Sequence, residues 1–430
     1  MRVLPILLFL LTIPACDGAI GDLFGVFPAD VFQPETPDGG GQIPPGDGRG
    51  FQPEEVGFLE AAQGVTGDVR NIALAQVGIV ILAFLTAGTD GVHMVDVTQP
   101  ELVNSGDFLT TIHDSVLTAP AAIAGGRVDA LAVVDNTYLI CVAVGSGAPN
   151  AVTVFHIPTL LANATSPVAD LSAAFVEKIA GPDIAVPGVG GKGGGASGQG
   201  GAFAVATGGP ELGLAAILPG TPGTWTSATA FVSAAAPKVD NFVDVLFTLN
   251  GVFASVKSDT IFGIISLTLT GAIPPALTAV TPGAIDVEDP ARGGNFDILI
   301  NSPTTVTGPG NYPMDLTLDV FSLLVTGDNQ IRIFNVTNPA LTTAPSVLDG
   351  TGDGTVSVDG SGGFFAVGAR DAVRVYTSLG GAPQIVAQVP FTTANLIIRG
   401  VALTSAAAGR FVLACGGTRG LRIIQWSDTP

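Results

Sequence analysis

The sequence predicts an all-β protein, a β-propeller of seven four-stranded blades that an N-terminal strand closes. A pair of apolar runs around a short turn recurs along the chain, and such repeated units need neighbours to bury their apolar faces. The composition agrees, because 58 Gly and 31 Pro stand beside only 12% charged residues, which leaves little material for exposed helices. Apolar runs bounded by Gly, Asp, Asn or Pro are typical of short strands.

The repeated pair is clearest at residues 80–100, where two apolar runs flank a Thr-Asp-Gly turn. It returns at 320–339 around an Asp-Asn-Gln turn, and in shorter form at 364–376 and 411–426. Two apolar runs joined by such a turn predict a β-hairpin. Each copy is therefore expected to form the second and third strands of one blade.

Four strands per unit give seven units along the chain. They are expected at residues 69–109, 129–179, 183–232, 239–280, 316–348, 355–391 and 396–426. The last unit has only three strands, and residues 55–61 supply the fourth, which closes the ring and removes an exposed sheet edge. A Gly-rich insertion is expected at about 187–201. Residues 284–307 form either a second insertion or a degenerate eighth blade.

Two of the repeats resemble a known motif. Residues 91–100 and 330–339 look like the LVIVD repeat of bacterial and archaeal surface proteins, whose form is G-L-x-I-V-D-V-S-x-P, and residues 420–427 match its first half. The resemblance implies a propeller and an extracytoplasmic setting, and it implies no enzymatic activity. The Asp or Asn that ends the motif's strand builds a turn, so Asp96 and Asn335 are expected to be turn residues.

The N-terminus carries an export signal. Residues 1–15 have the charge, apolar run and small-residue end of a signal peptide. The sequence Ile13-Pro14-Ala15-Cys16 resembles the lipobox of bacterial lipoproteins, which implies that Cys16 is lipidated and becomes the first mature residue. An ordinary secretory peptide cut nearby is the alternative. Residues 16–53 read as a Gly- and Pro-rich tether that spans roughly 35 Å as a flexible coil, and residues 54–430 as the propeller.

Charge and cysteine usage limit the partners. With 36 acidic and 16 basic residues, the chain lacks the basic stripe that nucleic-acid binding needs. Membrane contact is expected through the lipid anchor only, in the bacterial cell envelope, on the outer side of the inner membrane or on the outer membrane. The protein is expected to be a monomer that binds an unknown protein, peptide or glycan. Cys141 and Cys415 fall in equivalent second strands of different blades and are expected to be buried thiols.

The predicted partner-binding face is the set of turns between second and third strands. In a propeller these turns share one face with the connections between blades. The charged residues there are Asp90, Asp328, Arg370, Asp371 and Arg419. They predict contact with a polar or anionic partner such as a glycan, peptide or carboxylate. The alternative is that they are solvated residues chosen for their turn conformation.

Candidate catalytic and metal-binding residues are few. Asp349, Asp353 and Asp359 partly fit a calcium loop, but Gly360 stands where a bidentate Glu is needed, so an ordinary turn between blades is favoured over calcium. No cofactor is expected, and no nucleophile with its partners is present. The sequence therefore predicts a binding or scaffold module with no catalytic residue assigned. The alternative is a propeller hydrolase or lactonase that uses carboxylates and a metal ion at the central channel.

Overall fold

A computed structural model describes residues 52–427 with gaps in several loops, the longest at 113–126, 181–194, 282–297 and 301–314. The chain divides into residues 1–42 and 43–430, and every described residue belongs to the second unit. The expected signal peptide (1–15), Cys16 and all but the last two residues of the expected tether (16–53) therefore lie outside the described residues.

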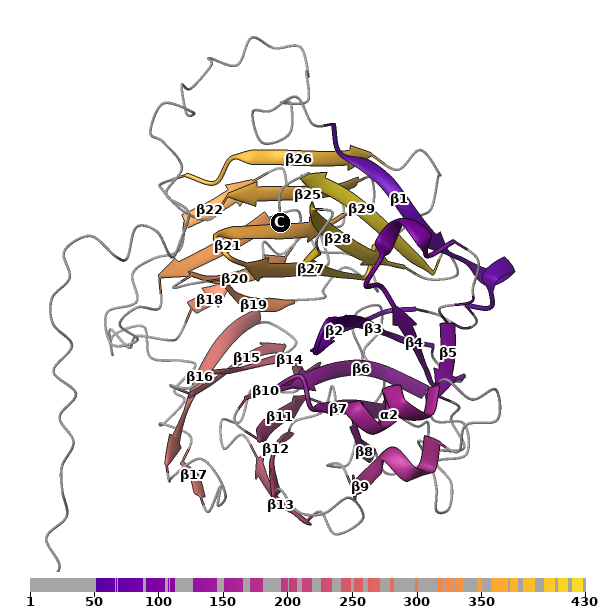
Figure 1. Ribbon diagram of the computed structural model, residues 1–430. Coiled ribbons are helices and arrows are strands. Elements are labelled where there is room, and N and C mark those ends of the chain that lie inside the picture. The colour runs from indigo at the N-terminus through magenta and orange to yellow at the C-terminus, as the bar shows by residue number, and fades with distance from the viewer. Residues whose placement is uncertain are drawn as a thin grey trace, which may run out of the picture. The chain divides into compact units, whose positions relative to one another are not determined.

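The described residues of the second unit form seven antiparallel sheets, which we call blades one to seven in chain order (Figure 1). Blade one contains β2 (Ile72–Val77), β3 (Val80–Thr86), β4 (Val92–Asp96) and β5 (Leu109–Ile112). Blade two contains β6 (Arg127–Val134), β7 (Tyr138–Val144), β8 (Ala151–His156) and β9 (Phe175–Ala180). Blade three contains β10 (Gly195–Gln199), β11 (Ala202–Ala206), β12 (Glu211–Leu218) and β13 (Thr226–Ser233).

The remaining blades repeat this order. Blade four contains β14 (Asn241–Thr248), β15 (Gly251–Lys257), β16 (Phe262–Thr270) and β17 (Ala279–Thr281). Blade five contains β19 (Leu316–Asp319), β20 (Ser322–Gly327), β21 (Gln330–Asn335) and β22 (Ser346–Asp349). Blade six contains β23 (Ser357–Ser361), β24 (Phe364–Gly368), β25 (Ala372–Thr377) and β26 (Ile385–Pro390). Blade seven contains β27 (Gly400–Ala406), β28 (Gly409–Cys415), β29 (Leu421–Ser427) and, from the other end of the chain, β1 (Glu54–Leu59).

The first strands of the blades form a closed ring. Each of β2, β6, β10, β14, β19, β23 and β27 lies beside the next, and β27 lies beside β2. The fold is therefore a seven-bladed β-propeller, as the repeats predict. The alternative of an eighth blade at 284–307 is wrong, because its described residues Ile298–Ile300 form β18, which pairs with the edge of β16 in blade four.

The ring is closed by the N-terminal strand. β1 pairs antiparallel with β29, from Glu54 opposite Gln425 to Leu59 opposite Leu421. Figure 1 shows the indigo strand β1 beside the yellow strand β29. The prediction that residues 55–61 complete the last blade is thus confirmed to within two residues at either end.

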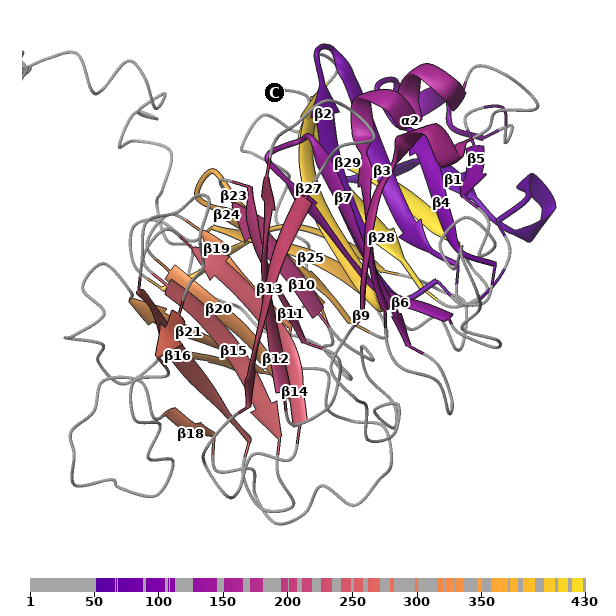
Figure 2. The same ribbon diagram turned by 90° about the horizontal axis from the view of Figure 1, so that it is seen from below.

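The expected Gly-rich insertion at 187–201 is wrong for its last part. Residues 195–199 form β10, the inner strand of blade three, which lies beside β6 and β14; Figure 2 shows β10 and β14 side by side. Small residues suit this crowded position, and Ser197 Oγ accepts a hydrogen bond from the Phe247 backbone N–H of blade four (2.9 Å). Residues 187–194 lie outside the described residues.

The apolar core lies between neighbouring blades. Phe84 of blade one and Phe155 of blade two belong to one buried cluster, while Leu85 of blade one and Phe411 of blade seven belong to another. Cys141 and Cys415 are buried free thiols in these two separate clusters, as predicted from their equivalent strands. Burial raises the pKa of the Cys141 thiol, which makes it a poor nucleophile.

Helices are short connections. The 3-10 turns are η2 (Ala61–Gln63), η3 (Pro100–Leu102) and η4 (Leu171–Ala174), and the helix α2 (Ile157–Ala164) lies beside β8 with Ile157 and Leu160 buried. Among the described residues, no helix has both the length and the apolar character needed to cross a bilayer.

Each blade has its turns at two faces of the ring. Neighbouring inner strands run in the same direction: Asp315 and Asp319 of blade five bind the backbone of Val358 and Gly363 in blade six, in the same chain order. Turns between second and third strands therefore share one face with the connections between blades, which we call the turn face. Turns between first and second strands share the other, the base face, with the connections between third and fourth strands.

Candidate functional site

The turn face contains the five residues predicted to contact a partner. Asp90 lies between β3 and β4, Asp328 between β20 and β21, Arg370 and Asp371 between β24 and β25, and Arg419 between β28 and β29. Blades five, six, seven and one follow one another around the ring, so these turns are neighbours. Asp328, Arg370, Asp371 and Arg419 themselves lie outside the described residues, and Asp90 is partly buried.

The backbone of these turns is similar in three of the four blades. A hydrogen bond closes each turn, from Ala87 N–H to Gly91 C=O (2.8 Å), from Ala369 N–H to Ala372 C=O (3.0 Å) and from Gly416 N–H to Gly420 C=O (3.2 Å). Gly91 and Gly420 have φ values of 101° and 66°, a region that favours glycine. Gly91 and Gly420 therefore shape the turns of blades one and seven.

Asp96 is a turn residue, as the resemblance to the repeat implies. Its Oδ1 accepts hydrogen bonds from the Thr98 backbone N–H (2.9 Å) and the Thr98 hydroxyl (2.6 Å). The Thr98 hydroxyl oxygen in turn accepts the backbone N–H of Ile81 (3.0 Å). This short chain of bonds fixes the connection at the end of β4.

The three candidate calcium ligands are not one loop. Asp349 ends β22, the outer strand of blade five, and Asp359 lies in β23, the inner strand of blade six; Asp353 lies outside the described residues. The segment between the two strands connects blades five and six, as expected for an interblade turn. Within the described part of the chain, no group of three His, Cys, Asp or Glu side chains could hold a metal ion.

Polar side chains join the inner strands of blades five and six, in a set that we call the inner seam (Asp315, Thr317, Asp319, Ser357 and Asp359). Asp315 Oδ2 accepts hydrogen bonds from the Ser357 hydroxyl (2.7 Å) and the Val358 N–H (3.0 Å). Asp319 Oδ1 accepts the Gly363 N–H (3.1 Å). Alternate residues of a strand point to the same side, which explains the spacing of two between Asp315, Thr317 and Asp319.

The inner seam continues into blade seven. Ser357 Oγ accepts the Val401 N–H (3.0 Å), and Asp359 Oδ2 accepts the Leu403 N–H (2.7 Å). Burial raises the pKa of the Asp359 carboxyl to about 6, and the nearby Asp315 adds to the rise, while the hydrogen bond from Leu403 opposes it. An inner strand is the edge of its own sheet, so its outward N–H groups need acceptors from the neighbouring blade.

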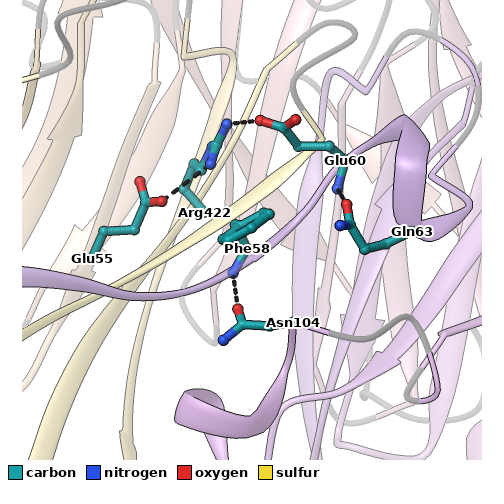
Figure 3. Close-up of polar contacts among 6 residues, drawn as sticks. All are labelled: Glu55, Phe58, Glu60, Gln63, Asn104 and Arg422. Carbon is teal, nitrogen blue, oxygen red and sulfur yellow. Dashed lines mark hydrogen bonds and ion pairs between the residues drawn. The ribbon is translucent and has the colours of Figure 1, made fainter.

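A second set of polar contacts holds the closing strand (Figure 3). Arg422 of β29 binds Glu55 Oε1 (3.1 Å) and the carboxylate of Glu60, and its guanidinium lies 5.3 Å from the centre of the Phe58 ring. On the other side of β1, the Phe58 N–H donates to Asn104 Oδ1 of blade one (2.9 Å). The closing strand is therefore bonded to blade seven along one edge and to blade one along the other.

Arg422 occupies the variable position of the repeat, and His93 occupies the same position in blade one. His93 is fully buried, and its Nδ1 lies 2.9 Å from Thr111 Oγ1 in β5. In both blades this side chain links the third strand to the fourth. The role is structural, and it keeps the outer strand in register.

The sequence analysis did not predict the inner seam or the contacts of Arg422 with Glu55, Glu60 and Phe58. The alternation Asp-x-Thr-x-Asp at 315–319 and Ser-x-Asp at 357–359 was a usable signal for the first, because polar residues at every second position of an inner strand must face a neighbour. The ion pair between Arg422 and Glu55 joins residues 367 positions apart, and only the ring closure brings them together.

Strand pairing and the closed ring define a β-propeller protein. No protein-family model and no curated protein match the chain. Solved structures with a similar fold include the β-propeller domain of Cps50 (Swd1) from Myceliophteria thermophila, with 13% identity and a TM-score of 0.48, over 85% of this chain and 97% of that one.

A second similar structure is the extracellular domain of the hybrid two component system BT4673 from B. thetaiotaomicron. Its identity is 13% and its TM-score 0.46, over 86% of this chain and 39% of that one. This chain thus spans about two fifths of that protein chain. At such identities a likeness concerns the fold alone, and the blade count rests on the strand pairing described above.

Proposed function

We propose that this protein is a lipid-anchored, extracytoplasmic β-propeller that acts as a binding or scaffold module. The observation that supports the proposal is the closed ring, in which the turns between second and third strands of four consecutive blades share one face and three of these turns are closed by a similar backbone hydrogen bond. Loops held by a rigid scaffold are the usual place for binding residues. A ring closed between its two chain ends gives those turns a fixed spacing.

The lipid anchor is supported by the lipobox-like sequence that ends at Cys16 and by the Gly- and Pro-rich segment after it. Several acyl chains on one cysteine give stable anchoring, whereas a single chain does not. Expression in a bacterium that processes lipoproteins should place the mature protein in the membrane fraction and in the detergent phase on partitioning. Cys16→Ser should move it to the soluble fraction, and a Cys16→Ser protein that stays lipidated and membrane-bound would refute the anchor.

The partner is proposed to be polar or anionic, such as a glycan, a peptide or a carboxylate compound, and to contact Asp90, Asp328, Arg370, Asp371 and Arg419. Guanidinium groups bind carboxylates and phosphates through paired hydrogen bonds. With only 12 Arg among the 430 residues, the presence of one in each of two equivalent turns of neighbouring blades favours this assignment.

The test is capture of envelope components on immobilised protein. An Arg370→Ala/Arg419→Ala variant should lose the components that the native protein retains. The matched control is Arg49→Ala/Arg292→Ala, which removes the same two positive charges at positions outside these turns. If both variants retain the same components as the native protein, the turn face does not bind them through its arginines.

A further inference from the structure

The tether joins the ring at the base face. β1 begins at Glu54, opposite Gln425 near the end of β29, and ends at Leu59, opposite Leu421. Leu421 follows the turn that belongs to the turn face, and a Cβ on Gly420 in that turn would lie 2.0 Å from Leu59 O. The closing strand therefore runs from the base face toward the turn face, and its first residue, Glu54, lies at the base face.

The exposed apolar side chains lie at the same face. Among the described residues the exposed large hydrophobic side chains are Ile79 (85% exposed), Leu102 (50%) and Ile385 (36%). Ile79 is in the turn between β2 and β3, Leu102 is in η3 between β4 and β5, and Ile385 begins β26 after the connection from β25. All three are base-face positions, and they belong to blades one and six, which flank blade seven where the tether joins.

We propose that the lipid anchor is not the only membrane contact, and that the base face rests on the bilayer that holds the anchor, with Ile79, Leu102 and Ile385 touching the lipid surface, so that the turn face is displayed away from the membrane. This inference rests on the proposed lipid anchor. When a tether holds a domain at a bilayer, exposed apolar side chains gain free energy by leaving water for the membrane interface. As the flexible coil that its composition predicts, the tether would span roughly 35 Å and permit either face to reach the bilayer, so the apolar residues decide which face does.

Charge limits the kind of lipid. Glu101 and Asp135 are exposed at the base face, and the whole chain carries a formal net charge of −20. An anionic lipid surface would repel both carboxylates, because the electrostatic energy rises as like charges approach. The proposed surface is therefore a neutral, phosphatidylcholine- or phosphatidylethanolamine-like headgroup layer, and the contact depends on the anchor for its local concentration.

The test compares two positions at opposite ends of one strand. The seven residues of β3 separate the turn that holds Ile79 from the turn that holds Asp90 by about 20 Å. Ile79→Cys and Asp90→Cys are each labelled with an environment-sensitive fluorophore in full-length lipidated protein on phosphatidylcholine vesicles. Cys141 and Cys415 are buried and Cys16 is proposed to be acylated, so the new thiol takes the label. Spin-labelled lipid then serves as the quencher.

Quenching at position 79 and little at position 90 is the expected result, and Leu102→Cys should behave like position 79. Equal quenching at positions 79 and 90, or stronger quenching at 90, overturns the orientation while leaving the anchor intact, provided that the vesicles carry the protein on flotation. Failure of the native lipoprotein to float with vesicles removes the anchor and this inference with it. Replacing phosphatidylcholine by an anionic lipid should weaken the quenching at position 79.

Discussion

Ring closure can be tested at one side chain of the closing strand. Leu59 is the last residue of β1, is fully buried, and packs in the apolar cluster that joins blade seven to blade one. Leu59→Ala removes these contacts and leaves the strand pairing intact. The change therefore tests whether residues near the N-terminus stabilise a blade whose other strands lie at the C-terminus.

The expected loss follows from burial. Leu→Ala in a core costs about 2–5 kcal/mol, the larger values where the surroundings cannot relax. Leu59 lies in an edge strand, which can shift toward the vacated space, so about 2–3 kcal/mol of unfolding free energy is expected. That is a large fraction of the roughly 5–15 kcal/mol that stabilises a typical folded protein.

Urea unfolding of the unanchored Cys16→Ser chain, followed by far-UV circular dichroism, measures the loss. Leu102→Ala is the matched control, since Leu102 is half exposed in η3 beside the same strand, and such a change usually costs within about 0.5 kcal/mol. Equal midpoints for the native protein and Leu59→Ala would show that β1 does not stabilise the ring. Equal losses in both variants would mean that burial is not the reason.

Three further changes probe the same framework. Burial holds the pKa of Asp359 at about 6, above the 3.8 of an unfolded chain, so the folded form binds more protons between these values and this residue lowers stability as the pH rises from about 4 to about 7. Asp359→Asn should raise the unfolding free energy at pH 7.5 by about 1–2 kcal/mol and flatten the pH profile of urea midpoints. The control is Asp319→Asn. An unchanged profile in Asp359→Asn, or an equally flattened profile in the control, contradicts the prediction. A Cβ on Gly57 would lie 2.5 Å from Pro100 O, so Gly57→Ala should cost about 1–3 kcal/mol of unfolding free energy in the same assay by overpacking. A neutral result would mean that the backbone between blades seven and one shifts without cost. Arg422→Ala should cost about 1 kcal/mol of unfolding free energy, since its ion pairs are partly exposed. Added salt at 0.5 M should reduce this difference from the native protein. A difference that does not depend on salt would assign the loss to packing on the Phe58 ring.

The blades were predictable because each repeat carries its own turn. Apolar runs around a Gly- or Asp-containing turn identify hairpins locally, and the predicted units agree with the observed sheets to within a few residues except at the start of blade three. The closing strand followed from counting, since a last unit with three strands needs a fourth. A hairpin is encoded within one repeat, and the need for a closing strand follows from the order of the units.

The strand β10 and the polar contacts between blades depend on which blades are neighbours. The glycine tract that becomes β10 has the composition of a loop, and it is a strand because crowded inner positions accept residues without large side chains. The carboxylates of Asp315 and Asp359 accept hydrogen bonds from N–H groups of the following blade, so these partners are defined only once the blades are placed side by side. For the partner-binding face, the sequence assigns the charged residues to turns between second and third strands, but whether their side chains converge depends on loop conformations that no local pattern encodes.

Contacts at the two edges of each sheet connect ring closure with the spacing of the turns that are proposed to bind. A four-stranded blade has an inner edge and an outer edge, and each carries N–H groups that its own sheet leaves unpaired. In blades six and seven the inner edge is bonded by the seam residues of the preceding blade, such as Asp315 and Ser357. In blade seven the outer edge is bonded through Asn104 of the following blade. The charged turns of blades five, six, seven and one therefore rest on sheets that brace one another, and loss of β1 should loosen the spacing of these turns before it unfolds any single blade.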